Sequence, residues 1–209
     1  MAQSTVSILN GSGVATSMET FIDAAGINLP AYTVDSSIAR YRAAATWTPT
    51  ATAALTVAAL KGSASKTVRV HRIMLGGVAT ALSSTIFKLI RVSALGAGGT
   101  VVTPTVSKMD TTAGAATAVA EVYTTAAKAA DTTSEGPLSV FSLFQTTVTT
   151  PTVAYNEAQM VYPERGAPGG QSIVLRGTSE ILAITNFNGG NLAAGSALTL
   201  TIEWTEDAS

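Results

Sequence analysis

The sequence predicts an all-β protein, an antiparallel β-sandwich that is jelly-roll-like and is preceded by an extended N-terminal arm. Three observations favour this class. The strand formers threonine and valine are abundant, clusters of glycine, serine and asparagine interrupt the apolar stretches, and the C-terminal region alternates strictly between apolar and polar residues. Roughly eight to ten short strands separated by turns are typical of a sandwich or a jelly roll, and not of a parallel sheet.

The first 40 residues are expected to form the arm, and residues 41–209 the sandwich body. Two glycine-bearing, hairpin-like stretches lie in the arm, around Asn10-Gly11-Ser12-Gly13 and Ala25-Gly26. The apolar residues of this segment are too few for an independent core. We therefore expect the arm to pack on the body or on a neighbouring subunit.

The body strands are predicted from runs of apolar and β-branched residues that end at turn residues. In chain order they are expected at 43–48, 54–60, 66–75, 84–92, 101–107, 138–146, 172–176, 179–187 and 198–205. Glycine lowers the cost of a positive φ, so turns are expected at Gly76-Gly77, at 96–99, at Gly177-Thr178 and at 188–191.

The C-terminal strand has the clearest pattern in the chain. Its apolar positions alternate with polar ones, which are Thr199, Thr201, Glu203 and Thr205. This period of two predicts one face in the core, formed by Leu198, Leu200, Ile202 and Trp204, and one face in water. Trp204 is the largest of the inward residues, and we expect it to anchor the core.

The segment 111–130 is ambiguous. It is rich in alanine, and Val119, Val122, Tyr123 and Ala126 have helical spacing. Val119 and Tyr123 also share one face of a possible strand with Glu121 and Thr125. Propensity alone slightly favours a helix.

Composition and charge exclude several classes of protein. Only 12% of the residues are charged, the formal net charge is −1 and cysteine is absent. A polybasic nucleic-acid binder and a disulfide scaffold are therefore not expected. No membrane span or signal peptide is expected, because prolines and threonines break the longest uncharged stretch and the chain begins with polar residues. The mean hydropathy of +0.34 suggests apolar surface that other subunits cover.

Catalytic chemistry finds little support, so no enzyme, cofactor or metal site is expected. His71 is the only histidine, and strand alternation places it on the outward face. The pattern from Ser63 to Lys66 matches the serine-x-x-lysine motif of penicillin-binding enzymes without their other motifs, and indicates a turn before a strand. Glu157 and Glu164 border a loop and are interpreted as solvated charges.

One region is locally basic. Four basic residues occur within twelve positions, Lys61, Lys66, Arg69 and Arg72, and no acidic residue lies between Asp35 and Asp110. Nucleic acid is a poor partner for such a patch, because interleaved aromatic residues are missing. A patch that steers docking onto an acidic protein surface and a merely solvated face both remain open.

Several short motifs resemble a group of small structural proteins of tailed bacteriophages and prophages. The similar segments are Gly62-Ser63-Ala64-Ser65-Lys66-Thr67-Val68-Arg69-Val70-His71-Arg72-Ile73, Ala115-Ala116-Thr117-Ala118, Ile173-Val174-Leu175-Arg176-Gly177-Thr178-Ser179-Glu180 and Ile202-Glu203-Trp204-Thr205-Glu206. The opening is also similar, with Ile8-Leu9-Asn10-Gly11-Ser12-Gly13 and Leu29-Pro30. The resemblance covers most of residues 41–209.

The resemblance implies a non-enzymatic virion protein that decorates or cements the capsid exterior and stabilises contacts between capsomers. Its partners would be the major capsid protein and further copies of itself, with a trimer as one candidate. Such a protein is made in the host cytoplasm and ends on the capsid surface, with no nucleic-acid or membrane partner. The alternative is a tail, vertex or head-fibre attachment protein.

The resemblance also implies a strand over 117–125, against the alanine content. The chain departs from the group after Tyr123, where the alanines at 126, 127, 129 and 130 replace an expected proline-bearing turn. A short helix or an altered loop is expected there.

Overall fold

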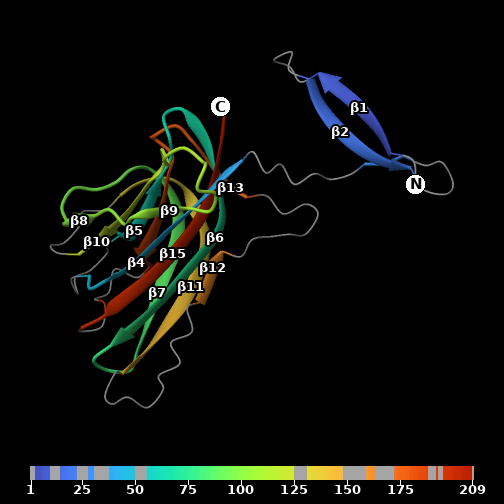
Figure 1. Cartoon of the computed structure of the whole chain (residues 1–209). Helices are drawn as coiled ribbons and strands as arrows, with labels where there is room; N and C mark the ends of the chain where they lie inside the picture. Colours follow the sequence, from blue (N-terminus) through green and yellow to red (C-terminus); the bar gives the residue numbers. More distant parts are fainter. Residues whose placement is uncertain are drawn as a thin grey trace. The chain divides into compact units, whose positions relative to one another are not determined.

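The structure is a computed structural model of the 209-residue chain (Figure 1). It describes residues 3–9, 15–22, 28–30, 38–49, 56–124, 131–147, 159–162, 172–187, 192 and 195–208. The chain divides into two units, Met1–Ile38 and Ala39–Ser209. Each unit is described by itself.

The described strands of the first unit form one antiparallel sheet. They are β1 (Gln3–Leu9), β2 (Ala15–Ile22) and β3 (Asn28–Pro30), in the order β1-β2-β3. In this sheet Val6 pairs with Met18, and Phe21 with Leu29. The sequence indicated hairpins in this region, although the expected turns at 10–13 and 25–26 lie outside the described residues.

The second unit is built from strands. They are β4 (Ala39–Trp47), β5 (Thr56–Lys61), β6 (Lys66–Ala79), β7 (Ser83–Ala94), β8 (Val101–Val102), β9 (Val106–Lys108), β10 (Val119–Tyr123), β11 (Thr132–Thr147), β12 (Gln159–Tyr162), β13 (Ile173–Arg176), β14 (Ile181–Asn186) and β15 (Ala197–Ala208).

Two antiparallel sheets pack as a sandwich, which confirms the predicted fold class. One sheet has the order β8-β10-β5-β14-β7-β11. In the other, β12 and β13 pair with β6, and β15, β4 and β9 follow. The end of β11 also pairs with β6 in parallel and so joins the sheets. The first and last strands of the body, β4 and β15, are neighbours, and the two quartets β13-β6-β15-β4 and β11-β7-β14-β5 have the jelly-roll order.

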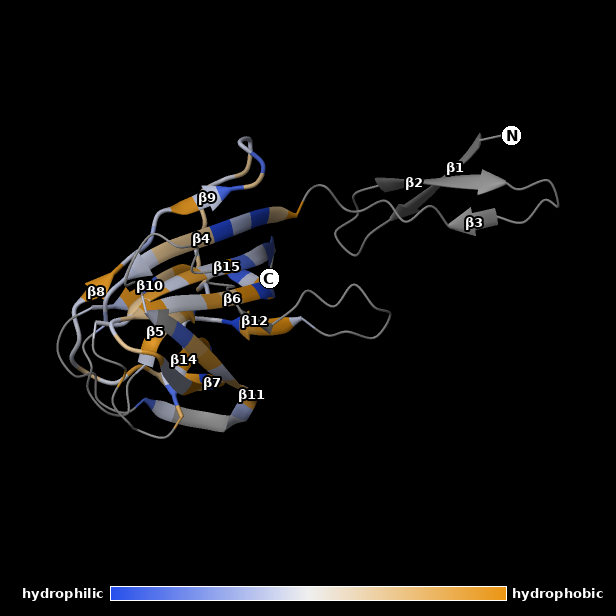
Figure 2. Cartoon of the chain, turned by 90° about the horizontal axis from the view of Figure 1, so that it is seen from below, coloured by the Kyte–Doolittle hydropathy of each residue, from blue (hydrophilic) through white to orange (hydrophobic). Residues whose placement is uncertain are grey.

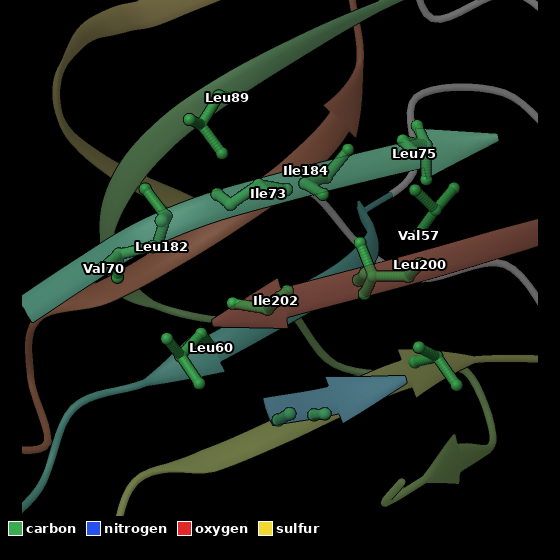
Figure 3. Packing of buried hydrophobic residues seen from close by; sticks show 14 of the residues in the cluster. Val57, Leu60, Val70, Ile73, Leu75, Leu89, Leu182, Ile184, Leu200 and Ile202 are labelled. Atoms are coloured by element: carbon green, nitrogen blue, oxygen red, sulfur yellow. The ribbon is translucent and has the colours of Figure 1, made fainter. Parts of the chain in front are cut away.

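The core lies between the two sheets and is formed by the alternate, inward residues of both (Figure 3). From β15 these are Leu198, Leu200, Ile202 and Trp204, the four that the alternation predicted. The Trp204 side chain is fully buried, and its ring stacks on Tyr41 of β4 with 5.9 Å between the ring centroids. Burial of each such large apolar side chain contributes about 1.5 to 3 kcal/mol.

A second, smaller apolar cluster lies on the other face of the sheet that contains β5, β14 and β7. Its buried members are Ala59, Ile90, Val92, Tyr123, Ile181 and Ala183. These residues alternate along their strands with members of the main core, such as Leu182 and Ile184 of β14. Burial on both faces explains why these strands read as continuous apolar runs and not as alternating ones.

β6 contains a β-bulge that preserves its apolar face. The buried residues change from even to odd positions along the strand, through Val68, Val70, Ile73 and Leu75. The register with β15 shifts between Glu203 and Trp204, and His71 is the extra residue. One added residue reverses the alternation, so both apolar pairs can face the core.

Three sequence predictions need correction. The expected turn at Gly76-Gly77 is wrong, because β6 continues through both glycines to Ala79. The predicted strand 101–107 is two short strands, β8 and β9, with Pro104 between them, since proline lacks the N–H that a ladder needs. β12 was not predicted, because its residues were read as part of a loop.

The ambiguous segment contains a strand, β10, and not a helix over the described residues. β10 pairs with β5, and Ala120 and Val122 face the main core. Burial between two sheets outweighs the high helix propensity of alanine, because the advantage of alanine over other residues is less than about 1 kcal/mol per residue. The alanine run from 126 to 130 lies outside the described residues.

Gly77 is required by close packing. We expect Gly77→Ala to lower the free energy of unfolding by about 1 to 3 kcal/mol, the usual cost of overpacking. An added Cβ would lie 2.8 Å from the Ala197 carbonyl oxygen and 2.8 Å from Leu198 Cδ2. Gly136→Ala is the matched control, because nothing lies within 4 Å of a Cβ there. Chemical denaturation measures both variants, and equal losses would contradict the packing argument.

Candidate docking surface

Three neighbouring strands of the sandwich, β4, β15 and β6, place charged side chains on their outward face. On β4, Arg40 and Arg42 flank the buried Tyr41, so alternation turns both arginines outward. Glu203 of β15 is in register with Arg42 on one side and with Arg72 of β6 on the other. Hydrophilic residues gather along these parts of β4, β15 and β6 in Figure 2.

We name this surface the basic face. It comprises Arg40, Arg42, Arg69, Arg72, His71, Thr205, Glu203 and Asp207. Its residues come from strands that are far apart in the sequence, with 161 positions between Arg42 and Glu203. Sheet pairing alone brings them together.

Glu203 lies at the centre of the basic face and is surrounded by three arginines. Arg42 donates to its Oε1 from Nε at 2.8 Å and also from a terminal guanidinium nitrogen, so the contact is a fork of two nitrogens on one oxygen. Arg40 donates to Oε2 at 3.1 Å, and a guanidinium nitrogen of Arg72 lies 4.0 Å from Oε1. The Glu203 side chain is 3% exposed, whereas those of Arg40, Arg42 and Arg72 are 36%, 44% and 34% exposed.

The charge state of Glu203 follows from this surrounding. Burial alone would raise its pKa, but the hydrogen bond and charge of Arg42, with the charge of Arg72 and the hydrogen bond of Arg40, hold the pKa below its usual value. Glu203 is therefore a carboxylate at neutral pH. Each guanidinium offers about five N–H donors and a carboxylate about four acceptor sites, so Glu203 does not occupy all the donors of Arg42 and Arg72.

The remaining charged pair of the basic face joins β6 to β15. Arg69 donates from Nε to Asp207 at 2.5 Å, and a ring nitrogen of His71 lies 2.9 Å from the Thr205 hydroxyl. Among the residues that the structure describes, the basic face thus holds four guanidinium groups and two carboxylates, so cationic side chains outnumber anionic ones. Such an excess, fixed on a rigid sheet, favours anionic groups.

The predicted basic patch is divided by the fold. Arg69 and Arg72 lie together on the basic face. Lys61 belongs to the other sheet, where it forms a 2.6 Å ion pair with Glu121 of β10. Lys66 begins β6 and is in register with Ala208 of β15.

Sequence reasoning missed Arg40 and Arg42, and it treated Glu203 as a solvated residue. The signal for the arginines was present, since they alternate with the apolar Tyr41 and Ala43. The expected boundary after residue 40 assigned Arg40 to the arm, whereas the structure places it in the first strand of the body. Nothing local to Glu203 indicates burial, because arginines from two other strands cover it.

Glu206 is a second buried carboxylate, and it faces the core side of β15. Its oxygens accept hydrogen bonds from the backbone N–H groups of Thr117 and Ala118 at 2.9 to 3.0 Å, and from the Thr117 hydroxyl at 2.6 Å. The indole N–H of Trp204 donates to it at 3.0 Å. This network ties the segment before β10 to β15.

Other singled-out residues have structural contacts. The Ser63 hydroxyl accepts from the N–H groups of Ser65 and Lys66, which confirms a turn before β6, and its oxygen lies 2.7 Å from the Thr117 hydroxyl oxygen. Tyr123 donates to Glu121 at 2.7 Å, and burial with this hydrogen bond raises the pKa of Tyr123. Glu157 and Glu164 lie outside the described residues.

Comparison of this chain with known protein families, curated proteins and solved structures finds no match. Over the described part of the chain, no group of three or more histidine, cysteine, aspartate or glutamate side chains is placed to hold a metal ion. The same residues include no helix with the length and hydropathy of a membrane span.

Proposed function

We propose that this protein is a non-enzymatic structural component of a tailed-bacteriophage virion that binds the capsid exterior and stabilises contacts between capsomers. The resemblance of its motifs to those of small phage structural proteins supports the assignment to a virion. The basic face supplies the docking surface. In this proposal the chain is made in the host cytoplasm and acts on the capsid surface, and its partner there is the major capsid protein.

The observation that carries the docking proposal is the predominance of arginine on the basic face, where the described residues hold four guanidinium groups and two carboxylates. Arginine side chains that are already ordered lose little further entropy when a partner binds. The rest of the chain has few charges, so a large interface elsewhere would require little desolvation of charged groups.

A separate feature supports association of the protein with further copies of itself. Along β11, Leu138, Val140 and Phe144 are exposed at alternate positions, and the Phe144 side chain is 65% exposed. Exposed apolar stripes are typical of contacts with other proteins. The molar mass of the free protein tests this, and a mass of one chain, 21.2 kDa, at all concentrations would contradict a homo-oligomer.

The first unit fits the proposed arm that reaches a second capsomer. Met1–Ile38 forms a compact unit of its own, and residues 1–38 carry three acidic and no basic residues. Two linked contacts raise the effective concentration of each other, so weak individual contacts can give tight binding.

Charge reversal on the basic face tests the docking proposal. We expect Arg69→Glu combined with Arg72→Glu to lower occupancy on purified capsids by at least about tenfold in co-sedimentation, because attraction becomes repulsion. The matched controls are Arg69→Lys with Arg72→Lys, which keeps the charge, and Lys88→Glu, which reverses a charge on the other sheet. Unchanged occupancy of the doubly reversed variant would overturn docking through this face.

Copy number separates capsid cement from the attachment alternative. A lattice-binding protein is expected in hundreds of copies per particle, whereas a tail, vertex or head-fibre protein is expected in about a dozen or fewer, since the symmetry of the particle sets the number of sites. Quantitative mass spectrometry of purified particles measures this ratio.

A further inference from the structure

The arrangement around Glu203 differs from an ordinary surface ion pair. Exposed pairs join one cation to one anion, and their side chains remain mobile. Here one nearly buried carboxylate contacts guanidinium groups from both flanking strands, and Arg42 holds it with two nitrogens. Because the N–H donors of a guanidinium group have a fixed geometry, two bonds from Arg42 to the same oxygen restrain the orientation of the group as well as its position.

We propose that Glu203 is a positioning residue, which orders the surrounding arginines so that the basic face binds an acidic protein segment through its carboxylates. This inference rests on the proposed docking function and names the chemistry of its partner. Arg42 and Arg72 supply guanidinium nitrogens beyond those that Glu203 occupies, and carboxylates match their planar geometry.

The surroundings of the basic face favour a protein segment over a nucleic acid or a sulfated glycan. Next to the arginines, the outward positions are neutral, with Ala44 on β4, Thr201 on β15 and Met74 on β6. Four described arginines, two of which already contact Glu203 and one Asp207 within 3.1 Å, are few for a polyanion with a charge on every unit. The outward described positions of these strands also hold no tryptophan, tyrosine or phenylalanine on which bases could stack.

The variant Glu203→Gln distinguishes a purely electrostatic effect from the positioning role, because the two predict opposite changes in the affinity for an acidic ligand. Glu203→Gln removes a negative charge, so the basic face becomes more positive by one charge, and electrostatics alone predicts tighter binding of an acidic ligand. If Glu203 orders the arginines, the same variant binds more weakly. Asp207→Asn is the matched control, because it changes the charge equally but at a carboxylate that pairs with Arg69.

The experiment measures binding of a synthetic deca-glutamate peptide to the full-length protein by calorimetry at low salt. We expect salt-sensitive binding to the wild type, at least about fivefold weaker binding to Glu203→Gln, and equal or tighter binding to Asp207→Asn. Arg42→Lys, which keeps the charge but loses the fork, should also weaken binding, and it gives the answer if Glu203→Gln does not fold.

Three results would overturn the inference. They are absence of peptide binding to the wild type, tighter binding to Glu203→Gln with unchanged binding to Arg42→Lys, and stronger binding of a sulfated oligosaccharide of equal charge than of the peptide. Capsid co-sedimentation is independent of this measurement. If the protein binds the peptide as expected but does not bind capsids, only the virion assignment fails. If the protein binds capsids but the peptide results contradict the inference, only the positioning role of Glu203 fails.

Discussion

Trp204→Ala is expected to lower the free energy of unfolding by about 3 to 5 kcal/mol, the usual cost of truncating a buried aromatic residue. The Trp204 side chain is fully buried at the centre of β15, stacks on Tyr41 and donates to Glu206. The substitution leaves a cavity between the sheets and removes one partner of a buried carboxylate. Both effects destabilise the folded state.

Thermal and chemical denaturation measure this loss, and Trp204→Phe is the control. Phenylalanine keeps most of the apolar contact but lacks the N–H group, so we expect it to cost less than alanine. A fully stable Trp204→Ala variant would show that the core does not depend on this side chain. Equal losses for the two variants would assign the whole effect to the hydrogen bond with Glu206.

Glu206→Gln is expected to lower the free energy of unfolding at neutral pH by about 3 kcal/mol. Both oxygens of the native carboxylate accept hydrogen bonds, whereas the amide of glutamine replaces one acceptor with a donor. A buried donor that faces N–H and O–H donors loses its partners, at a cost of about 1 to 3 kcal/mol for each unsatisfied group.

The same residue makes stability depend on pH. Burial would raise the pKa of Glu206, but hydrogen bonds from Thr117, Ala118 and Trp204 outweigh it and hold the pKa below its ordinary value. A carboxyl whose pKa is lowered on folding stabilises the protein above its unfolded pKa, about 4.3, and this contribution is lost as the pH falls through the folded pKa. Wild-type stability should therefore decrease below about pH 5.

Denaturation from pH 7 to pH 2 tests this dependence. Glu206→Gln should flatten part of the decrease, while Glu203 retains its own share, because its pKa is also lowered. Glu180→Gln is the control for a carboxylate at a turn outside the core. A Glu206→Gln variant with the same pH dependence as the wild type would contradict the role of this carboxylate.

The strands were largely predictable because their signals are local. The period of two over β15 identified its inward residues, and the alternation around Tyr41 would have placed both neighbouring arginines outward. Sequence patterns did not predict the structure correctly in two cases. Burial on both faces hid the alternation of some strands, and in the pair Gly76-Gly77 glycine is required by packing and not by a turn. Gly77 is the clearest case, since its constraint comes from β15, about 120 residues away in the chain.

Local patterns were enough to predict the fold class, most strands and the inward face of a regular strand such as β15, because the alternation of a strand depends only on neighbouring residues. The tertiary structure decided which strands lie side by side. It separated Lys61 from Arg69 and Arg72, and it placed Glu203 between arginines more than 100 residues away. Strand pairing between distant segments depends on the packing of the whole sandwich, so no local pattern could reveal the basic face.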